Sequence, residues 1–317
     1  MKERCSTEDI IFGKTDNKMR DLSFYVPHIG QIKLTNKALE FLVDNISSKE
    51  KSIFLINNGK EENYIDKYFL EKFFPVQIIN KGENIGLYRT YFDKDLDRDS
   101  NLLAFFHNDL FVYEKDFDKR IKGAFEENPR LGLLGFIGSD EIDFLGGRGL
   151  GTMSNFQGKK VSFWQGSPAE VHGKRINDFH TAVVLDSCAM IFRKEALGQL
   201  EFKQDLPLHH FHDRVVSVQI RELGWDIGVL GIECDHISGQ TANQEKIYFG
   251  SSRDWWRERD IKSFEEWSDK NKNWIDDNNN PSKGKKPENL DQLNYLEAER
   301  LFLTEYRDKK HLIPFKI

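Results

Sequence analysis

The sequence has few cysteines, no long apolar run and no excess of positive charge. Its 317 residues include three cysteines, Cys5, Cys188 and Cys234, which lie far apart in the chain. We therefore expect no disulfide scaffold and a reducing, cytoplasmic compartment. No run of about 18 apolar residues is present, so we expect no membrane-spanning helix. The first residues are charged and lack the apolar stretch of about 7–15 residues that a secretory signal needs.

The charge balance argues against one class of partner. The chain has 46 basic and 52 acidic residues and a formal net charge of −6, so we expect no binding to nucleic acid. Apolar residues make up 38% of the sequence, which is enough for a sizeable core. The length suits one large α/β domain with an appendage, or two modest domains.

Short apolar runs alternate with amphipathic stretches through the first half of the chain. The expected strands are 22–27, 52–57, 75–80, 101–106 and 131–138. Helices are expected from Thr35 to Ile46 and over 61–73, 86–96 and 114–127. Strands that alternate with helices at this spacing predict an α/β fold with a mainly parallel sheet and helices on both faces.

The second half is less regular. Residues 139–178 have no clear periodicity, and the apolar runs 181–192 and 226–236 predict two further strands. After Gly250 the composition becomes rich in tryptophan and charge. We therefore expect a main domain over 1–250 and a helical C-terminal extension over 251–317. The extension could shape a ligand site or make the contact between two copies of the chain in a homo-oligomer.

Polar residues follow the predicted strands, where parallel sheets bind ligands. His107, Asn108 and Asp109 come directly after the fourth strand. Asp109 is an oxygen ligand suited to Mg²⁺ or Mn²⁺, whereas His107 favours Mn²⁺ or a softer metal. His236 ends a later strand and could reach the same edge. The alternative is a solvated turn in which Asp109 caps the next helix, with His236 simply hydrogen-bonded.

Two other segments carry candidate functional residues. Asp213 precedes a predicted helix and is either a helix cap or a general base for an acceptor hydroxyl. It follows three histidines at 209, 210 and 212, whose spacing matches no structural zinc pattern strongly. The glycine-rich stretch 146–151 lacks the Lys-Ser/Thr of a phosphate-binding loop and is better interpreted as a lid hinge. Arg148 and Trp164 in the irregular region could contact a diphosphate and stack on a sugar.

Taken in order, these features resemble the family 2 glycosyltransferases and their GT-A relatives. The matching features over about residues 20–240 are Pro27, Asn57-Asn58-Gly59, Asn84-Ile85-Gly86, His107-Asn108-Asp109, Asp186-Ser187-Cys188-Ala189, Asp213 and His236. The resemblance implies a GT-A-type mixed sheet and a metal-dependent enzyme. Such an enzyme moves a sugar, here expected to be a hexose, from a nucleotide-sugar donor to a glycan or other hydroxyl acceptor, with inversion.

The resemblance also implies roles for single residues. Asp109 and His236 would bind Mn²⁺ or Mg²⁺, with His107 joining them, and Asp213 would be the catalytic base. The expected donor-binding residues are Pro27, His28, Asn57, Asn84, Gly86, Asn108, Arg148, Trp164 and Asp186. The sequence departs from the family pattern at His107 and Asn57, which stand where acids are expected.

Two other functions remain open at this point. A non-catalytic module that binds a nucleotide sugar or a glycan would tolerate the altered metal motif. Two histidines with one carboxylate also fit a non-haem iron oxygenase, although those sites usually lie in all-β folds.

Overall fold

The computed structural model describes the greater part of the chain. The described residues are 20–30, 32–47, 52–59, 76–96, 98–143, 146–148, 151–159, 173–207, 209–237, 266, 269–284, 290–309 and 315–316. None of the helices in these ranges is long and apolar enough to cross a membrane.

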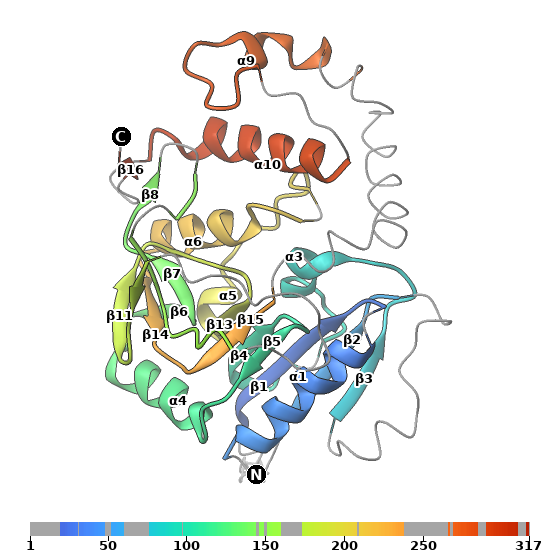
Figure 1. Ribbon diagram of the computed structural model, residues 1–317, viewed down its shortest axis with the longest axis vertical. Coiled ribbons are helices and arrows are strands. Elements are labelled where there is room, and N and C mark those ends of the chain that lie inside the picture. Colours follow the sequence, from blue (N-terminus) through green and yellow to red (C-terminus); the bar gives the residue numbers. More distant parts are fainter. Residues whose placement is uncertain are drawn as a thin grey trace, which may run out of the picture.

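An eight-stranded sheet forms the centre of the molecule (Figure 1). Its strands, in spatial order, are β11 (Phe179–Ala182), β14 (Asp226–Leu230), β6 (Leu131–Gly135), β13 (Ala189–Arg193), β4 (Ser100–Phe106), β1 (Arg20–His28), β2 (Ile53–Asn57) and β3 (Val76–Asn80). All run in one direction except β11 and β13. The predicted α/β fold with a mixed, mainly parallel sheet is therefore confirmed.

Helices cover both faces of this sheet. The helices α1 (Ile32–Asn45) and α4 (Phe117–Glu127) cover one face, and α3 (Gly86–Tyr91), α5 (Lys194–Leu197) and α6 (His212–Glu222) cover the other. Alternate residues of β1 point to opposite faces, as the two-residue period of a strand requires. Phe24 packs edge-on against Phe117 of α4, whereas Tyr25 stacks on Phe54 within the other core.

The C-terminal region adds helices beyond α6. The helix α10 (Leu290–Tyr306) lies next to α6, and α9 (Lys272–Asp276) lies farther out (Figure 1). Phe302 of α10 is fully buried and its ring lies 5.5 Å from that of Phe211, centroid to centroid. The described part of the extension is helical apart from turns and the short strand β16, and α10 shares a core with the main domain. The division at residue 250 stays a prediction.

Shorter strands complete the fold. The strand β5 (Leu110–Val112) pairs with β15 (Cys234–His236). A four-stranded sheet contains β10 (Lys174–Arg175), β9 (Thr152–Ser154), β7 (Ile137–Ser139) and β12 (Val184–Leu185), and β8 (Ile142–Asp143) pairs with β16 (Phe315–Lys316). The prediction of irregular structure over 139–178 therefore missed β8, β9 and β10, which are only two or three residues long.

The structure breaks three runs that were predicted as single strands. Residues 131–138 divide into β6 and β7, which belong to different sheets. Residues 181–192 form the end of β11, then β12, a turn, and β13. The turn forms because Asp186 Oδ1 accepts a hydrogen bond of 2.9 Å from the backbone N–H of Cys188. Residues 226–236 likewise divide into β14 and β15. The helix predicted over 61–73 lies outside the described residues.

Candidate metal and substrate site

Polar segments from distant parts of the chain meet at the carboxyl edge of the parallel strands. His28 of β1 pairs with Asn57 of β2, and β4 ends in the same direction at Phe106. Because β13 runs antiparallel to β4 and Ala189 pairs with Phe106, the turn before β13 lies at this edge as well. The backbone N–H of His107 donates a 2.9 Å hydrogen bond to the Cys188 carbonyl.

His236 reaches the same edge through a small antiparallel pair. His236 of β15 pairs with Leu110 of β5, and Leu110 is the residue directly after Asp109. The next residue, Ile237, donates its backbone N–H to the Asp109 carbonyl at 3.2 Å. These pairings place residue 236 beside residues 107–109, although 129 positions separate His107 from His236.

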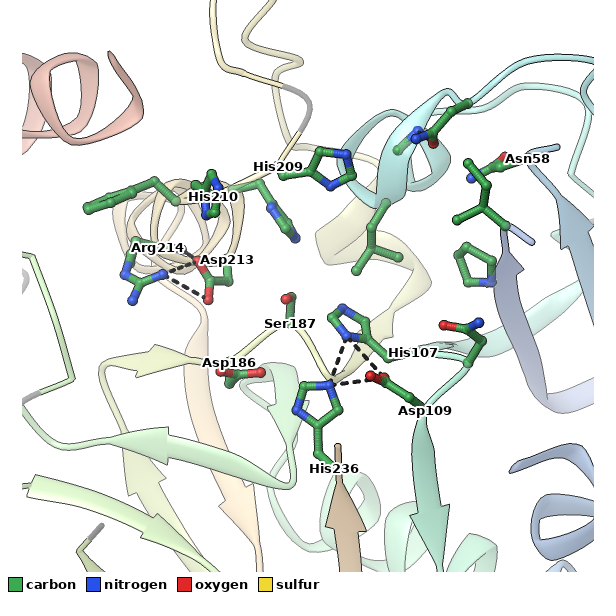
Figure 2. Close-up of a pocket in the computed structure, with 18 of the residues that line it drawn as sticks. Asn58, His107, Asp109, Asp186, Ser187, His209, His210, Asp213, Arg214 and His236 are labelled. Carbon is green, nitrogen blue, oxygen red and sulfur yellow. Dashed lines mark hydrogen bonds and ion pairs between the residues drawn. The ribbon is translucent and has the colours of Figure 1, made fainter. Parts of the chain in front are cut away.

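Three potential metal ligands converge there (Figure 2). His236 Nε2 lies 3.1 Å from Asp109 Oδ1 and 3.2 Å from His107 Nδ1, and His107 Nδ1 lies 3.8 Å from Asp109 Oδ1. The point equidistant from these atoms in their plane is about 2.0 Å from each, close to the metal–ligand distance of about 2.0–2.2 Å for small divalent ions. Asp109 Oδ1 is buried and accepts no hydrogen bond from a described residue. The three side chains therefore fit a divalent metal ion.

Burial and mutual charge set the protonation of this group. Burial alone would raise the pKa of Asp109, but the charges of His236 and His107 help to hold it below its usual value. Burial and the charge of His236 lower the pKa of His107. Burial also acts to lower the pKa of His236, yet the Asp109 and Asp186 carboxylates raise it. The carboxylate and at least one neutral imidazole are thus in the forms that bind metals.

A row of charged side chains continues from this group. A carboxylate oxygen of Asp186 lies within 4.8 Å of a ring nitrogen of His236, and Asp186 forms an ion pair with Arg148. Arg148 Nη1 also lies 3.9 Å from Asp213 Oδ2. Arg214 Nη1 contacts both oxygens of Asp213, at 2.9 and 3.2 Å. The row alternates in sign, so each carboxylate lies next to a guanidinium group.

The metal-ligand group and the charged row line one cavity of about 490 Å³, a volume typical of small-ligand sites. Most of the residues predicted from sequence line it: Pro27, His28, Asn84, Gly86, His107, Asn108, Asp109, Arg148, Asp186, Asp213 and His236. Two predicted residues do not belong to this set. Trp164 lies outside the described residues, and Asn57 is not among the lining side chains.

Asn57 holds a turn, and its neighbour faces the cavity. Asn57 Oδ1 accepts the backbone N–H of Gly59 at 3.2 Å, and its amide donates to Asn80 at 3.1 Å. Asn58 lines the cavity, and its Oδ1 is buried without a hydrogen bond from any described residue. A run of two asparagines at a strand end does not reveal which one faces the site.

A hydrogen-bonded chain orients the end of β1. Thr35 lies inside α1, which begins at Ile32, so Thr35 does not cap this helix. Its hydroxyl oxygen lies 2.7 Å from His28 Nδ1 and accepts the Asn108 amide at 2.9 Å. Thr35 thereby couples two of the predicted donor-binding residues, a role that the helix pattern could not show.

The other wall of the cavity comes from the start of α6 and from α10. It contains His209, His210, Phe211, His212 and Tyr295. His210 and Phe211 have left-handed backbone conformations, with φ of 71° and 57°, which are uncommon for residues other than glycine. The three histidines are visible in the sequence as a cluster, whereas Tyr295 carries no local signal and joins the site only through the packing of α10 on α6.

Comparison with known proteins yields structural similarity alone. No protein-family model and no curated protein sequence matches the chain. The mannosyltransferase PcManGT from Pyrobaculum calidifontis, in complex with GDP-Man and Mn²⁺, is 12% identical, with a TM-score of 0.45 over 90% of this chain and 75% of that one. A197 from STIV is 16% identical, with a TM-score of 0.34 over 69% of this chain and 85% of that one. Similarity at this level does not assign an activity.

Proposed function

We propose that this protein is a metal-dependent glycosyltransferase that moves a sugar from a nucleotide-sugar donor to an acceptor hydroxyl with inversion. The observation that carries the proposal is the convergence of the His107, Asp109 and His236 ligand atoms in a cavity that also contains the Asp213 carboxylate. The cavity lies at the edge of the sheet where α/β proteins bind their ligands.

The donor set indicates the kind of metal. His107, Asp109 and His236 would hold the ion. Two imidazoles and one carboxylate suit Mn²⁺ and other transition ions better than Mg²⁺, which prefers oxygen ligands and retains water. When bound, such an ion supplies positive charge that stabilises the departing nucleoside diphosphate.

The side chains around this group have separate tasks in the proposed reaction. On the β1–β3 side, Asn58 and Asn84 offer uncharged amides to the nucleotide. On the other side, Arg214 orients the Asp213 carboxylate, which accepts the proton of the attacking hydroxyl. Asp186, which also lines the cavity, is a poor proton acceptor. Burial acts to raise its pKa, but the charges of Arg148, His236 and His107 and the backbone N–H of Cys188 together outweigh burial and hold the pKa well below its usual value.

One observation favours a second candidate function. Two histidines and one carboxylate, as in the group at 107, 109 and 236, also form the iron site of non-haem oxygenases. Such sites are expected in all-β folds, whereas this chain has a mainly parallel sheet with helices on both faces. Iron in the purified protein, together with turnover of 2-oxoglutarate, would select the oxygenase.

A thermal-shift screen tests the main proposal. A ligand that binds only the folded protein increases the free energy of unfolding, by about 2.7 kcal/mol at a concentration of 100 times its Kd. The melting temperature rises as a result. We expect a nucleotide sugar or nucleoside diphosphate to raise the melting temperature in the presence of Mn²⁺ and much less in EDTA. The absence of a response to every nucleotide would reject the proposal.

A further inference from the structure

The cavity wall that faces the metal-ligand group differs from it in chemistry. Figure 2 shows His209 and His210 across the cavity from Asp109 and His236. This wall, formed by His209, His210, Phe211, His212 and Tyr295, is called the α6–α10 wall below. It carries imidazole and phenol groups, and its carboxylate neighbour Asp213 is paired with Arg214.

Tyr295 gives this wall an aromatic surface. Its side chain is one of the few large apolar groups that the described structure leaves exposed, at 38% of its surface. The rings of Phe211 and His210 hold it edge-on, with centroids 5.2 and 5.4 Å away. An aromatic ring fixed in this way at the rim of a polar cavity offers a flat, weakly polar face to a ligand.

His212 gives the wall a buried hydrogen-bonding group. It is 6% exposed and lies near Tyr88 and Tyr91, with ring centroids 6.1 and 6.0 Å away. Neither ring nitrogen has a hydrogen-bond partner among the described residues. Burial lowers its pKa to about 4, so the ring is neutral at pH 7 and can both donate and accept a hydrogen bond. Buried polar atoms are rarely left unpaired, so a ligand hydroxyl or water is expected there.

The charges near this wall are already balanced. The two arginines that line the cavity, Arg148 and Arg214, form ion pairs with Asp186 and Asp213. Among the described lining residues no other lysine or arginine is present. A ligand with a carboxylate or phosphate at this wall would therefore find no uncommitted cation to offset its desolvation.

We propose that the α6–α10 wall is the acceptor subsite and that it binds an uncharged pyranose ring. The ring of Tyr295 packs on the apolar C–H face of the sugar, and His212 hydrogen-bonds one of its hydroxyl groups. Asp213, next to His212 in the first turn of α6, is then within the same region as the hydroxyl to be activated. The acceptor role of this subsite rests on the proposed transferase function, whereas sugar binding at the wall does not.

Saturation-transfer NMR with the methyl glycosides of glucose, galactose and mannose tests this subsite. We expect transfer to the ring C–H protons of at least one glycoside. Tyr295→Ala should weaken binding about five-fold or more, and Tyr295→Phe should restore it because the ring is retained. Phe202→Ala is the matched control, since Phe202 is 39% exposed and lines a different cavity. Melting temperatures confirm that each variant is folded.

The outcomes separate the subsite from the transferase proposal. No transfer to any of the three glycosides, equal binding by Tyr295→Ala, or tighter binding of glucose 6-phosphate or a glucuronide overturns the subsite. If glycosides bind through Tyr295 but no nucleotide raises the melting temperature, the subsite stands and the transferase proposal fails. If a nucleotide sugar binds with Mn²⁺ but glycosides do not, the reverse holds.

Discussion

Asp109 presents a buried oxygen atom, Oδ1, that accepts no hydrogen bond from the described residues. A carboxylate in this situation is costly unless a cation completes its surroundings. The two imidazoles beside it offer ring nitrogens at 3.1 and 3.8 Å, and these are metal ligands when neutral. Asp109 Oδ1 is therefore the atom on which the candidate metal site depends most.

Replacing Asp109 tests that dependence. Asp109→Asn keeps the size of the side chain and removes its charge. Loss of a residue that only supports a metal ligand lowers affinity by about 10–100-fold, so Mn²⁺ affinity should fall by more than that here. Isothermal titration with Mn²⁺ measures the change. Asp95→Asn removes a carboxylate that is 81% exposed, and it should leave the affinity unchanged. Equal affinity in Asp109→Asn would remove this residue from the metal site.

Asp213 offers the test of catalysis. Asp213→Asn preserves the shape of the group and its place beside Arg214 but cannot accept a proton. We expect kcat to fall by about 10²–10⁴-fold with donor affinity little changed. Single-turnover assays and donor titration separate the two quantities. A variant with full activity would favour a binding module, and retained anomeric configuration in the product would remove Asp213 from the role of base.

The sequence predicted some residues of the site and missed others for identifiable reasons. Asp109 and His236 can be predicted as members of one candidate site because each follows an apolar run, and strand ends meet at one edge. Asn58 was passed over for Asn57 because only the turn geometry decides which amide faces inward. Tyr295 lies on a helix 59 positions beyond His236, and nothing in its neighbours marks it as a site residue.

Among the elements, β13 shows what an apolar pattern can and cannot predict. The run 181–192 consists mostly of apolar residues, and most of them are buried in the structure. A continuous strand is the simplest interpretation of such a run. In the structure the chain changes sheets after Ala182, and Val184 and Leu185 pair with β7 instead. The turn at Asp186 follows, and it is this turn that delivers a carboxylate to the site. Burial alone carries no information on which sheet a strand joins.

The helix α10 yields a prediction about stability. Phe302 is fully buried between Phe211 and Tyr306. Phe302→Ala removes this contact and leaves a cavity, so it should lower the free energy of unfolding by about 3–5 kcal/mol. Urea denaturation measures the loss, and Thr304→Ala, on an exposed position of the same helix, is the control. A small effect would contradict the contribution of the α10–α6 contact to the stability of the core.

For the whole molecule, His212 links stability to pH. Burial lowers its folded-state pKa to about 4, while an unfolded chain has the ordinary value of 6.5. The unfolded state therefore binds a proton first as the pH falls. The stability that His212 contributes is complete above pH 6.5 and is lost progressively down to about pH 4, on the order of 3 kcal/mol in total.

Substitution isolates this contribution. In His212→Asn the unfolding free energy should decline less between pH 6.5 and 4 than in the native protein. Asp213, which raises the pKa of His212, and Arg214, His107 and His210, which lower it, are unchanged in that variant. Identical slopes for His212→Asn and the native protein would contradict the assignment.

The left-handed conformations of His210 and Phe211 have an evolutionary consequence. Glycine adopts such φ values freely, and backbone strain of this kind costs about 1–3 kcal/mol per residue. At His210, whose side chain is half-buried, glycine would relieve this strain, whereas at Phe211 it would remove a fully buried ring from the core. The His210 side chain lines the cavity, so selection for binding and selection for stability oppose each other at this residue. Related chains in which residue 210 no longer contacts a ligand are where glycine or asparagine should appear first at this position.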